Sequence, residues 1–265
     1  MRYDTLPDDD AVDRSTSRTG PADSALKHPP LTARLLAGYL LTFVVLASVM
    51  TGLGFAVVDG FDSTALSKTD ERVADWFVEH RTEAWDRWTH VGSMFSDTLT
   101  IVIAATVVCL TTLVVARRWH ETFLLAGALL LEAMVFVTSA KLVSRDRPDV
   151  EQLDMSPPTS SFPSGHEGAA VAFYVGLAVI VYWQTHHRLA RSIVVLLAVV
   201  IPVSVGLSRM YRGMHFLTDI VAGALLGLVA VVVVYQIVRL GTEHLDRRRA
   251  EGDLRIPRHA TRLTR

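Results

Sequence analysis

A histidine and an aspartate near the start of an apolar stretch are the residues of this sequence best suited to nucleophilic chemistry. His215 and Asp219 are four positions apart, so both project from one face if the segment is helical. An aspartate that binds one ring nitrogen fixes the tautomer and leaves the other nitrogen free to attack. The same pair could instead only cap a helix, and the spacing alone does not separate these two interpretations.

A second cluster, Pro163-Ser164-Gly165-His166, has the composition of an anion-binding helix start. Ser164 is a good N-cap residue, and Gly165 lets backbone amides approach a ligand closely. The N-terminus of a helix attracts anions, and His166 in its first turn could donate a proton. A simple serine-capped helix with a solvated histidine is the alternative. Glu167 either raises the pKa of the neighbouring His166 or is simply an acidic residue at the first turn of a helix, where it is favourable.

Cationic side chains accompany both clusters. Arg209 lies six positions before the first histidine, and a third cluster contributes Lys141, Arg145 and Arg147. A guanidinium group matches phosphate oxygens bidentately and stays charged at any relevant pH. Phosphoryl transfer needs such groups, because charge in its transition state spreads over the equatorial oxygens. The three clusters together therefore predict phosphoryl-transfer chemistry.

Six long apolar stretches carry these clusters, in a chain of 265 residues of which 50% are hydrophobic. A bilayer core needs about 20 apolar residues in a helix, and lipid cannot satisfy open backbone groups. We therefore expect an all-α fold, a bundle of six transmembrane helices. The expected spans are 33–58, 98–116, 122–141, 168–183, 192–208 and 217–240. Glu132 lies inside the third span, where a carboxyl group is either a packing residue or a functional one.

The distribution of arginine predicts the orientation of the bundle. An even number of spans places both ends of the chain on one side, together with the arginine-containing loops at 117–118 and 188–191. The positive-inside rule then predicts cytoplasmic termini for a multi-pass protein of the plasma membrane. The other connections, 59–97, 142–167 and 209–216, fall on the extracytoplasmic side. All three clusters lie in or beside these connections, so we expect a single extracytoplasmic site.

The first of these connections, 59–97, interleaves aromatic and charged side chains at helical spacing. This pattern predicts an amphipathic helix on the outer membrane surface between spans 1 and 2, and a cap packed on the bundle would explain it equally well. The two ends of the chain are rich in charge and poor in aromatic residues. We therefore expect disordered cytoplasmic tails at 1–30 and 242–265 around a transmembrane domain at 31–241. Basic residues beside a membrane usually set topology, so no nucleic-acid partner is expected.

Between Lys141 and Asp219 the sequence resembles the type 2 phosphatidic acid phosphatase (PAP2) superfamily. The run from Ser208 to Asp219 matches the third motif of the family in full, and the run from Pro163 to His166 matches the second. The superfamily also contains bacterial undecaprenyl-pyrophosphate phosphatases and soluble vanadium haloperoxidases. The expected membrane spans favour the lipid phosphatase branch.

This resemblance implies a six-helix membrane fold in which His215 attacks phosphorus, Asp219 orients it and His166 protonates the leaving alcohol. The residues implied to hold the phosphate are Lys141, Arg147, Ser164, Gly165 and Arg209. Water would then hydrolyse the phosphohistidine, and neither a metal nor another cofactor is implied. The implied partners are the membrane and a lipid phosphate or pyrophosphate. The sequence makes no prediction of oligomeric state.

The first motif departs from the family pattern. Five residues separate Lys141 from Arg147 where the family usually has six, and on a helix this is a rotation of about 100°. Either Lys141 reaches the phosphate along its flexible side chain, or Arg145 takes over its role. Glu167 also departs, because the family commonly has a small or hydroxyl residue there.

Three functions remain open at this point. The first is a phosphatase acting on an isoprenyl pyrophosphate, phosphatidic acid, phosphatidylglycerophosphate or a phosphorylated glycolipid precursor. The second is a phosphotransferase that passes the phosphate from the same histidine to an alcohol. The third is a lipid-binding or transport protein without catalytic activity, against which the presence of both histidines counts.

Overall fold

The computed structural model describes residues 33–60, 65–155 and 159–254, and within these ranges the chain forms helices and no strand. Six of the helices are long and apolar enough to cross a membrane. The predicted all-α bundle of six spans is therefore confirmed. The predicted tail at 1–30 lies outside the described residues.

Apart from the end of the last helix, the spans begin and end within a few residues of the predicted positions. They are α2 (Ala33–Phe55), continued by the π-helical turn η1 (Ala56–Gly60); α5 (Thr98–Leu110), continued by η2 (Thr111–Val115); α6 (Trp119–Leu142); α7 (Gly165–Gln184); α8 (Arg188–Tyr211); and α9 (Leu217–Leu254). α7 begins three residues before its apolar stretch, because Ser164 is its N-cap and accepts a hydrogen bond from the amide of Glu167. The predicted N-cap is therefore confirmed.

The last helix is longer than the sequence suggested. α9 continues past the expected end of its span to Leu254, so residues 242–254 of the predicted disordered tail are helical. This segment is made mostly of leucine, arginine, glutamate and alanine, which are strong helix formers. The rest of the predicted tail lies outside the described residues.

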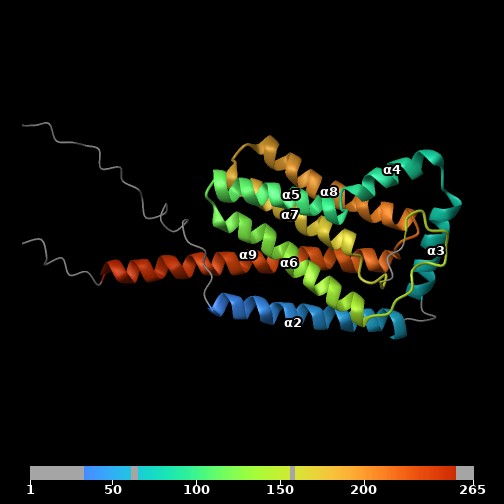
Figure 1. Ribbon diagram of the computed structural model, residues 1–265, viewed down its shortest axis with the longest axis horizontal. Helices are drawn as coiled ribbons and strands as arrows, with labels where there is room; N and C mark the ends of the chain where they lie inside the picture. Colours follow the sequence, from blue (N-terminus) through green and yellow to red (C-terminus); the bar gives the residue numbers. More distant parts are fainter. Residues whose placement is uncertain (1–32, 61–64, 156–158, 255–265) are drawn as a thin grey trace, which may run out of the picture.

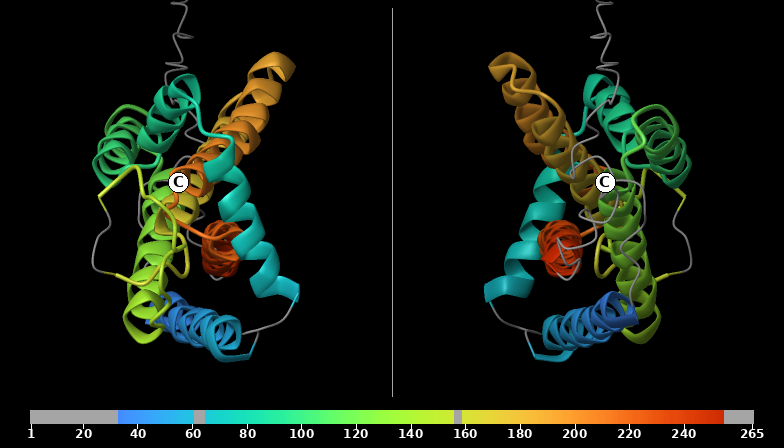
Figure 2. Two further views of the ribbon diagram at one scale, coloured as in Figure 1. Left: turned by 90° about the vertical axis from the view of Figure 1, so that its right-hand side faces the viewer. Right: turned by 90° about the vertical axis from the view of Figure 1, so that its left-hand side faces the viewer.

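The six spans lie side by side along the long axis of the molecule, and α9 extends beyond the others at one end (Figure 1). α7 packs against α6, α8 and α9, and α9 also packs against α2 and α6 (Figure 2). Most buried side chains of the apolar core come from α6, α7 and α9, and include Leu124, Leu131, Phe173, Leu226 and Val234. Many large apolar side chains of α2, α5 and α8 face outward, as expected for surfaces that meet lipid.

The connection between the first two spans contains two helices instead of the single predicted one. α3 (Ala65–Glu79) and α4 (Glu83–Met94) meet at residues 80–82, where Thr82 caps α4 by accepting a hydrogen bond from the amide of Trp85. Both helices pack on α8. The hydroxyl of Tyr211 at the end of α8 accepts from the Thr82 amide at 2.9 Å and donates to Asp86 at 2.8 Å. These contacts are those expected for a cap packed on the bundle, which was one of the two alternatives for this segment. Binding of the segment to the membrane surface stays a prediction.

Candidate active site

The three predicted clusters meet at one end of the bundle, beside α3 and α4 (Figure 1). There the chain passes from α6 to α7 and from α8 to α9. A cavity of about 1020 Å³ opens at this end, and its polar part is lined by Arg147, Gly165, His166, Arg209 and His215. The alternating direction of the spans thus brings side chains far apart in the sequence into one site, as the topology argument expected.

A tight turn between α8 and α9 holds Arg209 and His215 at the same cavity. Gly213 has a φ of +71°, a conformation that glycine adopts without strain, and a Cβ atom at this position would lie 2.9 Å from the carbonyl oxygen of Glu151. The Met214 amide donates to the carbonyl oxygen of Arg209 at 3.0 Å, which closes the end of α8.

The tautomer of His215 is set by a backbone carbonyl rather than by Asp219. His215 Nδ1 lies 2.8 Å from the carbonyl oxygen of Ser161. Because a carbonyl oxygen can only accept a hydrogen bond, Nδ1 carries the proton and Nε2 keeps its lone pair. The imidazole is buried and lines the cavity. Burial lowers the pKa of His215 below its ordinary value; Asp219 opposes this effect, and the cations Arg209 and Arg147 reinforce it. A neutral imidazole with a free Nε2 is a nucleophile.

Asp219 is close to His215 without the hydrogen bond that the sequence predicted. Its Oδ2 lies 3.7 Å from His215 Nδ1, too far for a hydrogen bond, and accepts from the Phe216 amide at 2.9 Å. Asp219 occupies the third position of α9, from which an acidic side chain reaches back to the N-cap amide. The aspartate therefore caps its helix and also places a negative charge beside His215. The capping interpretation of the sequence pattern therefore describes Asp219, and a role in activating His215 stays a prediction.

Arg145 belongs to a buried ion-pair network beside the cavity and does not line it. Its guanidinium group binds Asp219, Asp70 Oδ2 at 2.8 Å and the Thr218 hydroxyl at 2.7 Å, and it lies over the ring of Phe216. Asp70, on α3, also accepts from the amide of Thr218 at 3.1 Å. The network ties α3 to the start of α9. The guanidinium group of Arg145 therefore forms ion pairs with two carboxylates, Asp70 and Asp219.

Two other arginines line the cavity. Arg147 donates through Nη1 to the carbonyl oxygen of Met214 at 2.7 Å, and Arg209 donates through Nη1 to Ser93 at 2.9 Å and to Asp154 at 3.0 Å. The Nε atoms of both arginines are buried and have no hydrogen-bond partner among the described residues. Unpaired buried donors of charged groups are costly. Both arginines line the cavity, and their positive charge favours an anion there.

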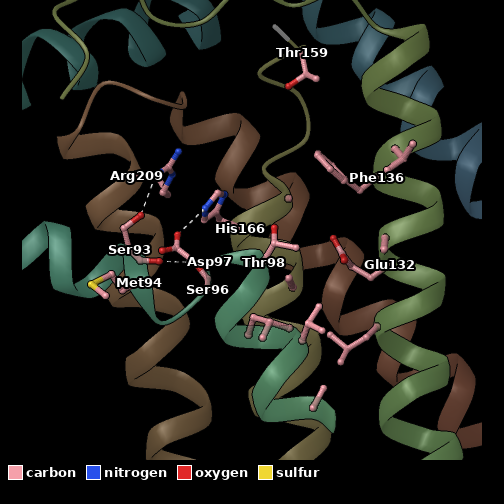
Figure 3. A pocket seen from close by; sticks show the side chains of 18 of the residues that line it. Ser93, Met94, Ser96, Asp97, Thr98, Glu132, Phe136, Thr159, His166 and Arg209 are labelled. Carbon is pink, nitrogen blue, oxygen red and sulfur yellow. Dashed lines mark hydrogen bonds and ion pairs between the residues drawn. The ribbon is translucent and has the colours of Figure 1, made fainter. Parts of the chain in front are cut away.

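His166 faces the same cavity from the first turn of α7. Its Nε2 lies 3.3 Å from Oδ1 of Asp97, the N-cap residue of α5 (Figure 3). Its side chain is 31% exposed, so it is more open to solvent than His215. A histidine at this position can exchange a proton with a group bound in the cavity.

The remaining predicted residues lie around the cavity in different ways. Lys141 is exposed on the last turn of α6 and does not line the cavity. The side chain of Ser164 is buried in its capping role, and its amide donates to the carbonyl oxygen of Asp219 at 3.0 Å. Gly165 lines the cavity, and a Cβ atom there would lie 2.8 Å from the ring of Phe136. The roles of these three residues in phosphate binding stay predictions.

Glu167 points away from the cavity. It is buried, and its carboxylate lies near Gly206 of α8, where a Cβ atom would be 3.1 Å from Glu167 Oε2. Its side chain does not line the cavity that His166 faces. Glu167 lies in the first turn of α7, where an acidic residue is favourable. This is the second of the two roles that the sequence suggested for it.

Three carboxylates of the site carried no signal in the sequence: Asp70, Asp97 and Asp154. Asp154 pairs with Arg212 at 2.6 Å as well as with Arg209. Burial opposes ionisation of this carboxyl group, but the hydrogen bonds and charges of the two arginines hold the pKa of Asp154 below its usual value. In the described ranges, no three His, Cys, Asp or Glu side chains converge as metal ligands do. The donors around the cavity are suited to an anion.

The fold and site thus define a membrane-spanning helical protein with a cavity lined by three histidines and two arginines, His90, His166, His215, Arg147 and Arg209. Residues 121–242 match the model of the PAP2 superfamily. Over this part of the chain, which carries all three clusters, the sequence is similar to the PAP2 superfamily, and the chain is an integral membrane protein.

Comparison with known proteins agrees with this assignment. Phosphatidylglycerophosphatase B of Bacillus subtilis (strain 168) is 37% identical over 116 residues, which are 40% of this chain and 55% of the relative. The chain thus matches about half the length of this curated relative. Two crystal structures share the fold: a transmembrane PAP2-type phosphatidylglycerolphosphate phosphatase from Bacillus subtilis (TM-score 0.59, 23% identity, 78% of this chain and 96% of the other) and LpxE of Aquifex aeolicus (TM-score 0.50, 19% identity, 62% and 93%).

Proposed function

We propose that this protein is a membrane lipid phosphatase that removes phosphate from a lipid phosphomonoester or pyrophosphate through a phosphohistidine on His215. The observation that carries the proposal is the arrangement of His215. Its tautomer leaves Nε2 with a lone pair, in a cavity that Arg147 and Arg209 also line. A neutral nucleophile beside cationic donors is what attack on a phosphoryl group requires.

The first step forms a bond between His215 Nε2 and phosphorus while the bond from phosphorus to the leaving oxygen breaks. Arg147 and Arg209 bind the equatorial oxygens, with the first-turn amides of α7 as further donors. Protonated His166 gives its proton to the leaving oxygen, so the lipid departs as an alcohol or a lipid monophosphate.

The second step returns the enzyme to its starting state. His166, now neutral, removes a proton from water, and the water oxygen attacks phosphorus as the bond to His215 Nε2 breaks. Inorganic phosphate leaves. During both steps the Asp219 carboxylate, 3.7 Å from Nδ1, stabilises the positive charge that forms on the imidazole of His215.

The shape of the cavity supports a lipid as the substrate. Below its polar end the wall is formed by apolar side chains of α5 and α6, including Ile101, Ala105, Leu129 and Phe136. An acyl or isoprenyl chain can lie along such a wall while its phosphate binds the arginines. We further infer that the site faces the extracytoplasmic side and that both ends of the chain are cytoplasmic, because the arginine-rich loops lie at the opposite end of the bundle.

Phosphate release by the purified protein tests this proposal directly. With a phosphatidylglycerophosphate, phosphatidic acid or isoprenyl pyrophosphate in mixed micelles and no added alcohol, the wild type should release inorganic phosphate, and His215→Asn should be slower by at least about 10³-fold. His187→Asn is the matched control. This histidine is the N-cap residue of α8 at the other end of the bundle, and asparagine is a good N-cap residue.

The outcomes separate the alternatives. Phosphate release by His215→Asn at a rate near that of the wild type would overturn the proposed nucleophile. Turnover that appears only when an alcohol acceptor is added would identify a phosphotransferase. Tight lipid binding without turnover under any condition would identify a binding or transport protein.

A further inference from the structure

The cap formed by α3 and α4 reaches one of the arginines of the site directly. Arg209 is 5% exposed, and its Nη1 donates to two side chains from outside α8. One is the hydroxyl of Ser93 on α4, at 2.9 Å, and the other is the carboxylate of Asp154, at 3.0 Å. Figure 3 shows Ser93 directed from α4 toward Arg209 at the edge of the pocket that both residues line. A hydroxyl group of the cap therefore holds a cation of the site.

The contact is possible because α4 lies unusually close to α8. A Cβ atom at Gly92 would lie 2.4 Å from the hydroxyl oxygen of Ser208, the residue before Arg209. That hydroxyl is itself held by the carbonyl oxygen of Ser204 at 2.7 Å. Glycine at position 92 thus lets the two helices approach, and the short side chain of Ser93 then reaches the guanidinium group. Ser93 is buried in this contact.

The second acceptor of Arg209 is also tied to the cap. Arg212 donates to both carboxylate oxygens of Asp154, at 2.6 and 2.8 Å, and its Nη1 donates to the carbonyl oxygen of Asp86 on α4 at 3.2 Å. The position of α4 therefore influences both acceptors of Arg209. A guanidinium group that is held in place before its ligand arrives loses less side-chain entropy on binding.

We propose that Ser93 is a positioning residue, whose hydroxyl holds the guanidinium group of Arg209 in the orientation that binds phosphate. The cap helix α4 is then a working part of the active site. Ser93 lies outside residues 121–242, the part of the chain that matches the family model, so the match assigns it no role. This inference rests on the proposed phosphatase function and adds a residue to its phosphate-binding machinery. Ser93 acts through Arg209 and exchanges no proton with the substrate.

Binding of inorganic phosphate to the purified protein measures this role without turnover. Ser93→Ala should raise the Kd for phosphate, measured by isothermal titration calorimetry, by about 10-fold, because Arg209 loses a hydrogen bond that fixes its charged group. The kcat/KM for the lipid phosphates named above should fall by at least about 10-fold, since the arginine also stabilises the transition state. Ser93→Cys should show the same losses, because a thiol fills a similar volume but is a weak acceptor.

A double-mutant cycle separates positioning from packing. In the Arg209→Gln background, adding Ser93→Ala should lower the remaining kcat/KM by less than about twofold, because the group that Ser93 holds is absent. A serine that only supported the fold would lower kcat/KM by the same factor in both backgrounds.

Tyr211→Phe is the matched control for the contact between α4 and α8. The hydroxyl of Tyr211 joins the end of α8 to Thr82 and Asp86 of the cap, rather than to Arg209. Its loss should lower Tm, because two hydrogen bonds of the cap are removed, and leave the Kd for phosphate within about threefold of the wild type.

The outcomes decide the role of Ser93. An unchanged Kd for phosphate in Ser93→Ala and Ser93→Cys would overturn the proposal, and so would equal losses from Ser93→Ala in the presence and absence of Arg209. Ser93→Cys keeps the test valid if Ser93→Ala does not fold. A wild type that binds phosphate but releases none from any lipid would refute the proposed phosphatase function, and the Kd values would still decide whether Ser93 positions Arg209.

Discussion

The two roles of Asp219 can be separated by a single pair of substitutions. Its carboxylate accepts from the amide of Phe216 and lies 3.7 Å from His215 Nδ1. Asp219→Asn keeps an oxygen that can accept from the amide but removes the charge. Asp219→Ala removes both. If the charge matters for catalysis, both variants should lose activity, and only the alanine variant should also lose the cap.

The distance sets the size of the expected effect. At 3.7 Å a negative charge stabilises a positive charge by about 4 kcal/mol at an effective dielectric constant of about 20. Arg145 binds the other carboxylate oxygen and offsets part of this energy. We therefore expect Asp219→Asn to lose about 2–3 kcal/mol of transition-state stabilisation, a decrease of roughly 30- to 150-fold in kcat/KM.

The assay is phosphate release by purified variants, with thermal unfolding measured in parallel. Asp219→Ala should lower the free energy of unfolding by about 1 kcal/mol more than Asp219→Asn, because the helix loses its cap. Asp70→Asn is the matched control, since Asp70 binds the same arginine but contacts neither histidine. It should lower Tm and change kcat/KM by less than about fivefold. If Asp219→Asn retains kcat/KM within about threefold of the wild type, the residue only caps α9 and the reasoning is refuted.

Two further predictions follow from the charges of the site. The acid limb of the pH profile of kcat/KM should lie below pH 6.5, because burial lowers the pKa of His215 and only the neutral imidazole attacks. In Arg147→Gln this limb should move to higher pH, because the variant loses a cation that disfavours protonation of His215. An unmoved limb would contradict this. Lys141→Ala should keep kcat/KM within about threefold, whereas Arg145→Ala should lower the free energy of unfolding by about 3–5 kcal/mol, because two buried carboxylates lose their partner. Loss of activity in Lys141→Ala at an unchanged Tm would show that the lysine reaches the phosphate.

The spans were predictable because lipid permits few structures. A backbone inside a membrane must satisfy its own hydrogen bonds, so each long apolar stretch had to be helical, and Thr98 and Leu217 begin their helices as expected. The alternating direction of the helices then placed the three clusters at one end. Hydropathy could not predict the exact start of α7, because the cap at Ser164 rather than the apolar stretch decides it.

The first motif shows where periodicity reasoning failed. The rotation argument for Lys141 and Arg147 assumed that a helix connects them. α6 ends at Leu142, and Val143 has an extended conformation. The one-residue difference in spacing therefore does not rotate one side chain relative to the other about a helix axis. The difference in spacing instead changes the positions of Arg145 and Arg147 along the non-helical segment that follows α6.

The acidic partners were not predictable from the sequence for a different reason. Asp70 and Asp97 lie in a connection that contains many charged residues, and Asp154 lies in a loop. No spacing rule distinguishes these three from their neighbours, since only tertiary packing brings them to Arg145, His166 and Arg209.

Backbone groups join the three motifs into one unit, and this explains why side-chain patterns describe the site incompletely. The carbonyl oxygen of Ser161, two residues before the second motif, fixes the tautomer of His215 in the third. The carbonyl oxygen of Met214 binds Arg147, and the carbonyl oxygen of Asp219 accepts from the amide of Ser164. Each motif therefore positions another through atoms that every residue type shares. A substitution that shifts the backbone at one motif should alter the other two, even when every side chain implied by the family resemblance is still present.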